Sequence, residues 1–441
     1  MYTLKINKYS KKLLFIFLSA FLIRLIGLNQ SFWLDEAVTA NVVKYNTLFG
    51  IIKNFSPHDF HPPFYYLFLK IWSLFFGYSE IALRFPSLLF SLATGYTVYK
   101  IGVLIKNKRF AYWSVLFFLF NPLIVYYSQE ARMYMMATFF IMISFYFLLK
   151  NKWFFFTFFS VLSLYTFYGS LFFILTSVYY VLYKKQYKNF LYFIFYLLFF
   201  IFLISPLLYY QWMNARKQLM IVSNWSSVLG TVSFKNLFLI PLKFSFGRIS
   251  FYPKPLYYMI AGMWTTIVLS FVCIGGLRNK KLFYFFTVPL IFGLIFSFFT
   301  PLLSYFRFLY LIPFMSILVV YGAAKKWQRS ILFSGFSILT FIYLFSQGFH
   351  REDWKNLAQD VVKYKKVYMI SSSSDPIKYY QSDVVVHDIS ELARVTGKII
   401  IVIPYSVDIW GVDYQSILRS KNYSLKSKKT FRGVVSEEWG R

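Results

Sequence analysis

The sequence predicts an all-α polytopic membrane protein with about eleven transmembrane helices and a small C-terminal α/β domain. Of the 441 residues, 58% are hydrophobic and only 14% are charged, whereas soluble domains carry about 25% charged residues. Apolar runs of about 18 or more residues, long enough to cross a bilayer as a helix, recur through the first three quarters of the chain. These runs are continuous rather than alternating, which argues against a transmembrane β-barrel. The composition also excludes a soluble enzyme and a disordered protein.

Basic side chains gather between the apolar runs, and acidic side chains are kept apart from them. The formal net charge is +31, yet no Asp or Glu occurs between Glu130 and Glu352. Short connections rich in Lys and Arg mark the cytoplasmic side of a membrane. Their attraction to anionic lipid headgroups accounts for the charge without a nucleic-acid partner. The acid-free basic clusters lie at 5–12, 106–109, 150–152, 184–188, 278–281 and 325–329.

A threading of about eleven spans with a cytoplasmic N-terminus satisfies both charge patterns. It places every basic cluster inside and every acid outside, in a multi-pass protein of the cell (plasma) membrane. The first span lacks a convincing cleavage site and is expected to stay uncleaved. The transmembrane domain then comprises residues 1–349, with a first outer loop at 29–83. Spans are expected at 13–28, 85–105, 110–127, 133–149, 153–167, 170–183, 190–210, 256–277, 282–300, 303–323 and 330–348.

Two segments outside the spans have a predictable structure. Residues 61–76 begin with prolines suited to a helix start and are rich in aromatic residues, so we expect a helix lying in the outer interface. Residues 350–441 alternate helical and strand-like patches, which predicts a soluble, extracytoplasmic α/β domain with a parallel sheet. This domain has no Gly-rich phosphate loop and is interpreted as a docking or acceptor-binding appendage.

The first outer loop carries the most informative acids. Asp35 and Glu36 are adjacent and follow directly after the first span. A carboxylate at the membrane surface can act as a general base or hold a cation, so both residues are candidate catalytic groups. The alternative is that they cap the helix that starts near Ala37, and Glu36 fits that alternative well.

Two histidines in the same loop raise the possibility of a metal site. His58 and His61 flank Asp59, and together with Asp35 and Glu36 they could ligate a divalent cation. The alternative is that they are ordinary loop residues. His58, Asp59 and His61 are also candidates for substrate binding.

A second polar group lies in the next outer turn, around Tyr127, Glu130 and Arg132. Charged groups at this depth are costly unless they are paired. Glu130 and Arg132 therefore either form an ion pair that closes a helix hairpin or form a wall of an active site facing Asp35. In the second case Glu130 is a candidate catalytic acid, and Tyr127 and Arg132 are candidates for substrate binding.

Basic residues on the outer side run against the charge bias and need a reason. An anionic phosphate at the membrane surface supplies one, and snorkelling to lipid headgroups is the alternative. The residues concerned are Arg84, Arg307 and, in or near the second outer loop at 211–255, Arg216, Lys217, Lys235, Lys243, Arg248 and Lys254. Of these, Arg84, Lys217 and Arg307 are the candidates for phosphate binding.

Four motifs together resemble one superfamily, the C-type (GT-C) glycosyltransferases. The branch is that of the protein O-mannosyltransferases and the lipid A aminoarabinose transferases, with most likeness to bacterial dolichyl-phosphate-mannose–protein mannosyltransferase-like proteins. The motifs are Leu-Asp35-Glu36-Ala, His61-Pro62-Pro63, Arg84-Phe85-Pro86-Ser and Tyr-Ser128-Gln-Glu130-Ala-Arg132-Met-Tyr; the start of the C-terminal domain, Glu352-Asp353-Trp354-Lys355, is also similar.

The resemblance implies transfer of a sugar from a polyprenyl-phosphate donor, on the outer membrane face, with inversion at the anomeric carbon. Asp35 would act as base or position the acceptor, and Arg307, with Arg84 or Lys217, would hold the lipid phosphate. The acceptor, whether glycan, lipid or protein, stays open. Protein O-mannosyltransferases continue His-Pro-Pro with Leu-Gly-Lys where this chain has Phe64-Tyr65-Tyr66, and aminoarabinose transferases carry an acid before Pro-Pro where this chain has His61.

Two other classes of function use a lipid-linked sugar. A transporter or flippase for a lipid-linked sugar would place ionisable groups near the bilayer midplane, but no acid lies inside a predicted span. A polysaccharide polymerase or ligase would also use a lipid-linked sugar but has a different loop pattern. The size of the donor, a single-sugar phosphate or an oligosaccharide diphosphate, distinguishes these classes of function.

Overall fold

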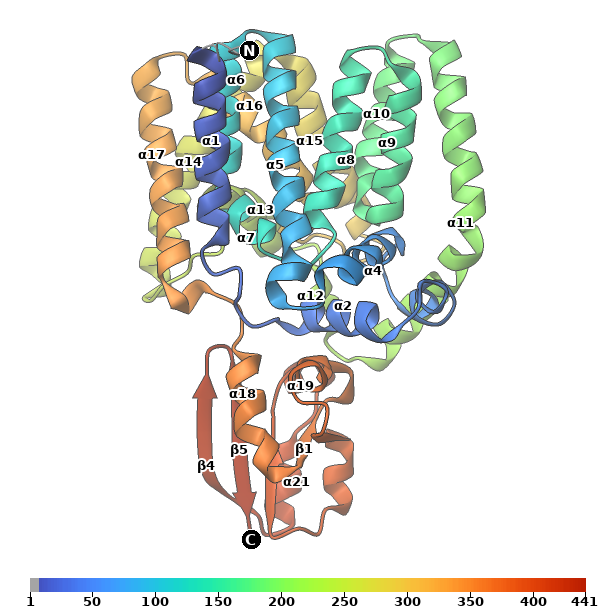
Figure 1. Ribbon diagram of the computed structural model, residues 1–441, viewed down its shortest axis with the longest axis vertical. Coiled ribbons are helices and arrows are strands. Elements are labelled where there is room, and N and C mark those ends of the chain that lie inside the picture. Colours follow the sequence, from blue (N-terminus) through green and yellow to red (C-terminus); the bar gives the residue numbers. More distant parts are fainter. Residues whose placement is uncertain (1–7) are drawn as a thin grey trace, which may run out of the picture.

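A bundle of long helices carries the α/β domain at one end (Figure 1). The computed structural model describes residues 8–441, so Lys5 of the first basic cluster lies outside the described residues. Each of the eleven predicted spans overlaps a helix, and the span predicted at 110–127 overlaps two, so that twelve helices correspond to the eleven spans. These helices are α1 (Lys8–Leu25), α5 (Glu80–Ile105), α6 (Lys108–Leu119), α7 (Pro122–Ser128), α8 (Tyr134–Leu149), α9 (Trp153–Thr166), α10 (Leu171–Tyr183), α11 (Tyr187–Ile221), α14 (Lys254–Arg278), α15 (Lys280–Ser297), α16 (Ile312–Gly322) and α17 (Lys326–Phe345).

The helices differ in their capacity to cross a membrane. Within residues 8–441, six are long and apolar enough: α5, α11, α14, α15, the segment Tyr305–Gly322 that includes α16, and α17. The bent pair α6–α7 would make a seventh, and α8, α9 and Tyr168–Tyr183 are shorter apolar helices. The helical, multi-pass architecture is therefore confirmed, while the number of eleven spans stays a prediction.

The expected continuous span at 110–127 is wrong in one respect, because the helix breaks in its middle. Helix α6 ends at Leu119, and α7 begins after Asn121 at an angle of 64°. The side chain of Asn121 accepts hydrogen bonds from the backbone N–H groups of Leu123 and Ile124 and donates to the Phe244 carbonyl. Pro122 then occupies the first helical position, where the helix does not need the backbone N–H that proline lacks. The break directs α7 and the acids that follow it across the end of the bundle.

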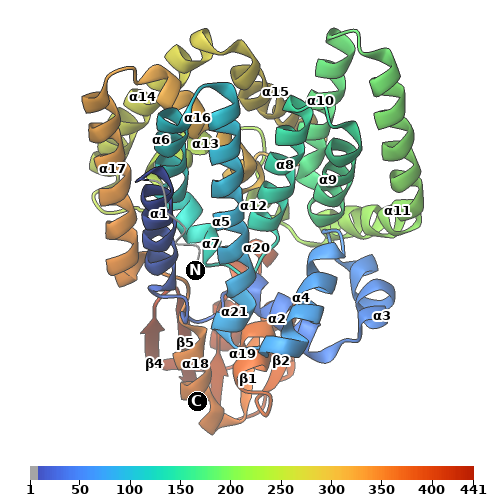
Figure 2. The ribbon, with the colours of Figure 1, turned by 45° about the horizontal axis from the view of Figure 1, so that its top comes forward.

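Short helices cover the end of the bundle that faces the α/β domain. Helix α2 packs against α4 and against α19 of the domain (Figure 2). Helix α4 confirms the helix expected at 61–76; it follows two prolines and ends at Gly77, whose φ is +80°. The short helices of this region are α2 (Leu34–Tyr45), α3 (Leu48–Gly50), α4 (Phe64–Phe76), α12 (Trp225–Leu229) and α13 (Phe234–Phe246).

The C-terminal domain is a mixed sheet rather than the parallel sheet expected. Strands β1 (Lys366–Met369), β2 (Val385–Asp388) and β3 (Ile399–Val402) are parallel as predicted, but β4 (Ser424–Phe431) and β5 (Val434–Gly440) add an antiparallel hairpin, giving the order β2-β1-β3-β5-β4. The hairpin was not predicted from the sequence, because β4 is an exposed edge strand that is rich in lysine and has no alternation of apolar residues. The helices of the domain are α18 (Trp354–Val361), α19 (Asp375–Tyr380), α20 (Val407–Trp410) and α21 (Tyr414–Ser420).

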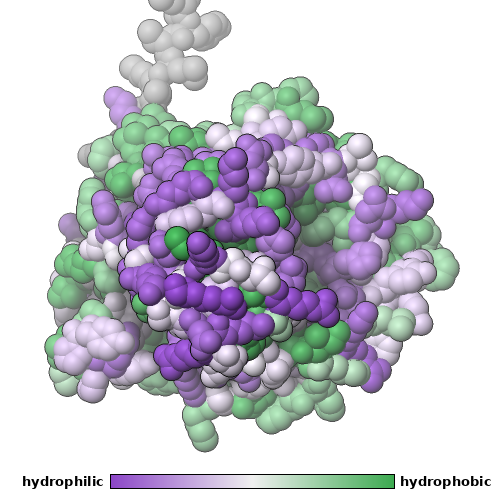
Figure 3. Space-filling view, turned by 90° about the horizontal axis from the view of Figure 1, so that it is seen from below, coloured by the Kyte–Doolittle hydropathy of each residue, from purple (hydrophilic) through white to green (hydrophobic). Residues whose placement is uncertain are grey.

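Hydropathy separates the two parts of the molecule. Seen from the domain end, hydrophilic atoms fill the centre of the view and hydrophobic atoms lie around its rim (Figure 3). The sheet domain has its own cores, one built around Trp354 and Leu357 and the other around Leu418 and Trp439. The domain therefore has the polar exterior of a water-exposed unit, whereas the sides of the bundle are apolar.

Close backbone contact between α14 and α16 generates a first prediction. A Cβ atom added at Gly275 would lie 2.0 Å from the Leu318 carbonyl oxygen, and one added at Gly322 would lie 2.0 Å from the Phe271 carbonyl oxygen. Small residues of this kind let helices pack closely in membranes. We expect Gly275→Ala to lower the free energy of unfolding by about 1–3 kcal/mol, because neither backbone can yield locally. The measurement is a thermal melt in detergent followed by tryptophan fluorescence. Gly262→Ala, on the same helix with open space at its Cβ, is the matched control; equal melting temperatures for the two variants would contradict the packing argument.

Candidate active site

The polar centre of the molecule is a buried ion pair between Glu36 and Arg84. Helix α2 supplies Glu36 and α5 supplies Arg84, and both side chains are fully buried. Arg84 Nε lies 2.8 Å from Glu36 Oε1, and Arg84 Nη2 lies 2.6 Å from Oε2. Its remaining N–H groups donate to the carbonyls of Leu28, Gln30 and Ser31. All five donors of the guanidinium are thus used, which fixes the chain between the first helix and α2.

A second arginine, Arg351 at the start of the C-terminal domain, also contacts Glu36. Arg351 Nε lies 3.3 Å from Glu36 Oε2, and Arg351 Nη2 lies 3.3 Å from Glu130 Oε2. The Arg351 guanidinium also lies 4.3 Å from the centre of the Tyr126 ring. Residues 350–441 were expected to form a separate domain, so sequence reasoning missed Arg351. Its only sequence signal is that it directly precedes Glu352.

Burial acts in the same direction on the two buried acids, and the neighbouring arginines separate their pKa values. Burial opposes the charged form of Glu36, but Arg84 and Arg351 outweigh it, so that its pKa is lowered. Burial raises the pKa of Glu130 to about 7, although Arg351 acts in the other direction. Among residues 8–441, oxygen Oε1 of Glu130 has no hydrogen-bond partner. The backbone N–H of Ala131 donates to Glu36 Oε1 at 2.7 Å, so the turn after α7 is tied to α2.

A second, more accessible group surrounds Asp35. The Asp35 side chain keeps 40% of its surface exposed, and its Oδ2 lies 3.6 Å from Arg132 Nη2. Arg132 Nη2 also lies 3.5 Å from His61 Nε2, and His61 Nδ1 lies 3.4 Å from Asp59 Oδ1. His61 and Arg132 lower the pKa of Asp59 against the opposing effect of burial. Asp35, Arg132, His61 and Asp59 therefore form one chain of contacts, and Arg132 faces Asp35.

Three cations lie close together where α13 leads into α14: Lys243 on α13, Arg248 between the two helices, and Lys254 at the first position of α14. Arg248 is exposed, donates to the Tyr126 hydroxyl at 2.6 Å and lies 4.7 Å from the centre of the Tyr126 ring. Burial, with Arg248 and Lys254 nearby, lowers the pKa of Lys243 to about 8. Within the described part of the chain, no ion pair joins Lys243, Arg248 or Lys254 to a carboxylate. Neighbouring cations without acids form a surface suited to an anion.

The first residues of the α/β domain complete the polar region. Glu352 accepts hydrogen bonds from the Trp354 indole at 2.7 Å and from the Tyr405 hydroxyl at 2.9 Å. Burial raises the pKa of Glu352, and among nearby charges Arg248 lowers it and Asp35 raises it. Sequence reasoning assigned no role to Glu352 or Tyr405, because only the folded chain brings them opposite Asp35.

Four other residues predicted for the site have different surroundings. Tyr127 is buried and its ring contacts those of Tyr126 and Tyr134. Arg307 donates to the Pro301 carbonyl and lies over the Phe306 ring. His58 Nδ1 lies 2.9 Å from the Asn54 carbonyl rather than beside the acids, and Lys217 is exposed near the end of α11.

The five residues considered for a metal do not assemble around one point. Among residues 8–441 no group of three or more His, Cys, Asp or Glu side chains is close enough to hold a metal ion. Glu36 is committed to Arg84, and His58 to the Asn54 carbonyl. A divalent-cation requirement stays a prediction.

Comparison with known proteins agrees with this architecture. Residues 60–210 match the family model for dolichyl-phosphate-mannose-protein mannosyltransferase. The fold is similar to the crystal structure of ArnT from Cupriavidus metallidurans in the apo state, at 10% identity and a TM-score of 0.65, covering 98% of each chain. The chain has the GT-C fold. ArnT bound to undecaprenyl phosphate gives 11% identity and a TM-score of 0.62, over 97% of this chain and 98% of that one. The apo oligosaccharyltransferase of Archaeoglobus fulgidus gives 11% and 0.52, over 87% and 65%. No curated protein sequence matched.

The buried charge cluster generates a second prediction. We expect Glu36→Gln to lower the free energy of unfolding by about 3–5 kcal/mol, because it leaves two buried guanidinium groups short of negative charge. Thermal unfolding in detergent measures the effect. Glu391→Gln, at a half-exposed carboxylate in the α/β domain, is the control. A melting temperature for Glu36→Gln equal to that of the control would show that the cluster is not needed for stability.

Proposed function

We propose that this protein is an inverting glycosyltransferase that moves one sugar from a polyprenyl-phosphate donor to an acceptor hydroxyl. The observation that carries the proposal is the partly exposed carboxylate of Asp35, held by Arg132 at the same polar end of the bundle as cations that lack acidic partners. The similar fold of ArnT, whose structure holds undecaprenyl phosphate, supports a lipid-phosphate donor. The α/β domain and the site would lie on the outer face of the cell membrane, with the N-terminus in the cytoplasm.

Asp35 is assigned the role of general base. Its ion pair with Arg132 uses Oδ2, and we assign Oδ1 to the acceptor hydroxyl. In the step itself, the acceptor oxygen forms a bond to the anomeric carbon while the bond from that carbon to the phosphate oxygen breaks. The hydroxyl proton passes to Asp35 and the electron pair leaves on the phosphate.

The leaving phosphate needs positive charge beside it. Arg248 is assigned this contact because it is exposed and is anchored through Tyr126 to the buried cluster. Lys243 and Lys254 lie close enough to Arg248 to add to the positive field. Arg307, which lies over the ring of Phe306, is assigned to the same anion, as the family resemblance implies.

Glu36 and Glu130, predicted as catalytic residues, are assigned a positioning role instead. Both oxygens of Glu36 are taken by Arg84, Arg351 and the Ala131 N–H, so Glu36 has no oxygen left for a substrate. Glu130 is buried behind Arg351. These residues hold α2, α5 and the start of the α/β domain in the arrangement that exposes Asp35.

The assignment of Asp35 gives a third prediction. We expect Asp35→Asn to reduce sugar transfer by about 10²–10⁴-fold, because the amide cannot take the hydroxyl proton. The purified protein would be given polyprenyl-phosphate mannose, glucose and arabinose in turn, and release of polyprenyl phosphate would be measured with and without a chelator of divalent cations. Asp383→Asn, at an exposed position in the α/β domain, is the control. Wild-type turnover by Asp35→Asn would remove the proposed base, and donor movement across a vesicle without release would favour a transporter.

The assignment of Arg248 gives a fourth prediction. We expect Arg248→Gln to weaken inhibition by free polyprenyl phosphate by roughly tenfold or more, because a charge-assisted contact to the phosphate is lost. Lys235→Gln removes an exposed cation from the same region and is expected to leave inhibition unchanged. If both variants behave alike, general attraction to the membrane surface rather than a specific phosphate contact explains these cations.

A further inference from the structure

A cavity lies at the end of the bundle opposite the candidate active site. It has a volume of about 240 Å³ and is formed where α8 and α10 end and α15 begins. Helix α8 runs from this cavity to the turn that carries Arg132, a length of about 24 Å for its residues. The cavity is therefore separate from the site assigned to sugar transfer. Its lining residues are Phe145, Leu148, Leu149, Asn151, Tyr180, Lys184, Gln186, Lys281 and Phe285.

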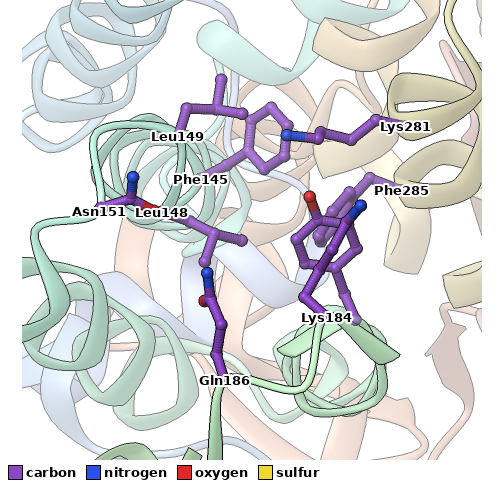
Figure 4. Close-up of a pocket in the computed structure, with 9 residues that line it drawn as sticks. Phe145, Leu148, Leu149, Asn151, Lys184, Gln186, Lys281 and Phe285 are labelled. Atoms are coloured by element: carbon purple, nitrogen blue, oxygen red, sulfur yellow. The ribbon is translucent and has the colours of Figure 1, made fainter. Parts of the chain in front are cut away.

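The lining combines two cations with an apolar wall. Lys184 directly follows α10, Lys281 is in α15, and both extend into the space beside the phenyl rings (Figure 4). Phe145, Leu148 and Phe285 form the apolar part, and Asn151 and Gln186 add amide groups at the edge. Lys281 Nζ lies 5.4 Å from the centre of the Tyr180 ring, a contact that leaves its charge uncompensated by any acid.

No carboxylate is available from the surrounding helices to neutralise these lysines. The sequence contains no Asp or Glu between Glu130 and Glu352, which includes every element that lines the cavity. Lys150, Lys152 and Lys185 lie on the connections beside it and add to the positive charge. Two ammonium groups at one cavity without a counter-ion form a site that favours an anion.

We propose that this cavity binds the phosphate headgroup of an anionic membrane phospholipid. Basic pockets between helix ends at a membrane surface are suited to such headgroups. The cavity is smaller than the roughly 300–1,000 Å³ of a site that encloses a whole drug-sized ligand, so it accommodates the headgroup while the acyl chains stay in the bilayer. Lys184 and Lys281 contact the phosphate, and Phe145, Leu148 and Phe285 contact the glycerol and first methylene groups. The bound lipid joins α8, α10 and α15 at their shared end.

The proposal is tested with the full-length protein in detergent, to which phosphatidylglycerol, phosphatidylcholine or inorganic phosphate is added. Native mass spectrometry counts retained lipids, and a thermal melt measures stabilisation. We expect phosphatidylglycerol alone to be retained and to raise the melting temperature. The double variant Lys184→Gln/Lys281→Gln is expected to lose at least half of that shift, whereas Lys184→Arg/Lys281→Arg keeps it.

The matched control is Lys152→Gln/Lys185→Gln, which removes the same charge from the same face but from residues that do not line the cavity. An equal loss in both Gln pairs would overturn the proposal in favour of general surface attraction. Equal stabilisation by phosphatidylcholine would remove the role of charge, and equal stabilisation by inorganic phosphate would identify a free-phosphate site instead. Sugar transfer is not needed for any of these readouts, so the proposal stands or falls independently of the proposed function.

Discussion

The structure depends on one requirement, that charges removed from water must be paired. Glu36 and Arg84 form a fully buried ion pair. Burying an ion costs several kcal/mol unless the charge is compensated. The fold meets the requirement by bringing three remote parts of the chain to one point: α2, α5 and the residue that opens the C-terminal domain, Arg351. The positions of α2 and of the α/β domain on the bundle follow from this pairing. A second set of contacts at the same interface, such as Asn41 to Asp375 and Phe32 N–H to the Tyr380 hydroxyl, then closes around it.

The same requirement separates structural acids from an available one. Adjacent residues in the sequence end in opposite environments, because Glu36 points into the ion-pair cluster while Asp35 keeps 40% of its side chain exposed. The backbone of α2 makes this difference, since consecutive residues on a helix project about 100° apart. Arg132 contacts Asp35, and the Ala131 N–H contacts Glu36. One short turn after α7 therefore serves both acids.

The distribution of charge along the chain also organises the two ends of the bundle. Acids are confined to the end that carries the α/β domain, where they meet arginines at short range. The opposite end carries lysines and arginines, and the chain between Glu130 and Glu352 contains no acid that could neutralise them. Chemistry that needs both signs of charge is therefore possible only at the domain end, and binding of anions only is favoured at the other.

The sequence by itself determined the membrane class, the helical segments, the polar end of the bundle and the group of acids from which the site is built. It could do so because hydropathy and charge are properties of each residue, and because Leu-Asp35-Glu36-Ala and Glu130-Ala-Arg132 are local patterns. The parallel half of the sheet was also predictable from its apolar strands. Only the tertiary structure decided that α6 and α7 break at Asn121, that β4 and β5 form a hairpin, and that Arg351 rather than any residue of the bundle completes the Glu36 pair. These features depend on which distant groups meet. The free energy of a buried charge depends on the groups that surround it in space. Glu36 and Arg351, which meet in the buried cluster, lie 315 positions apart in the chain.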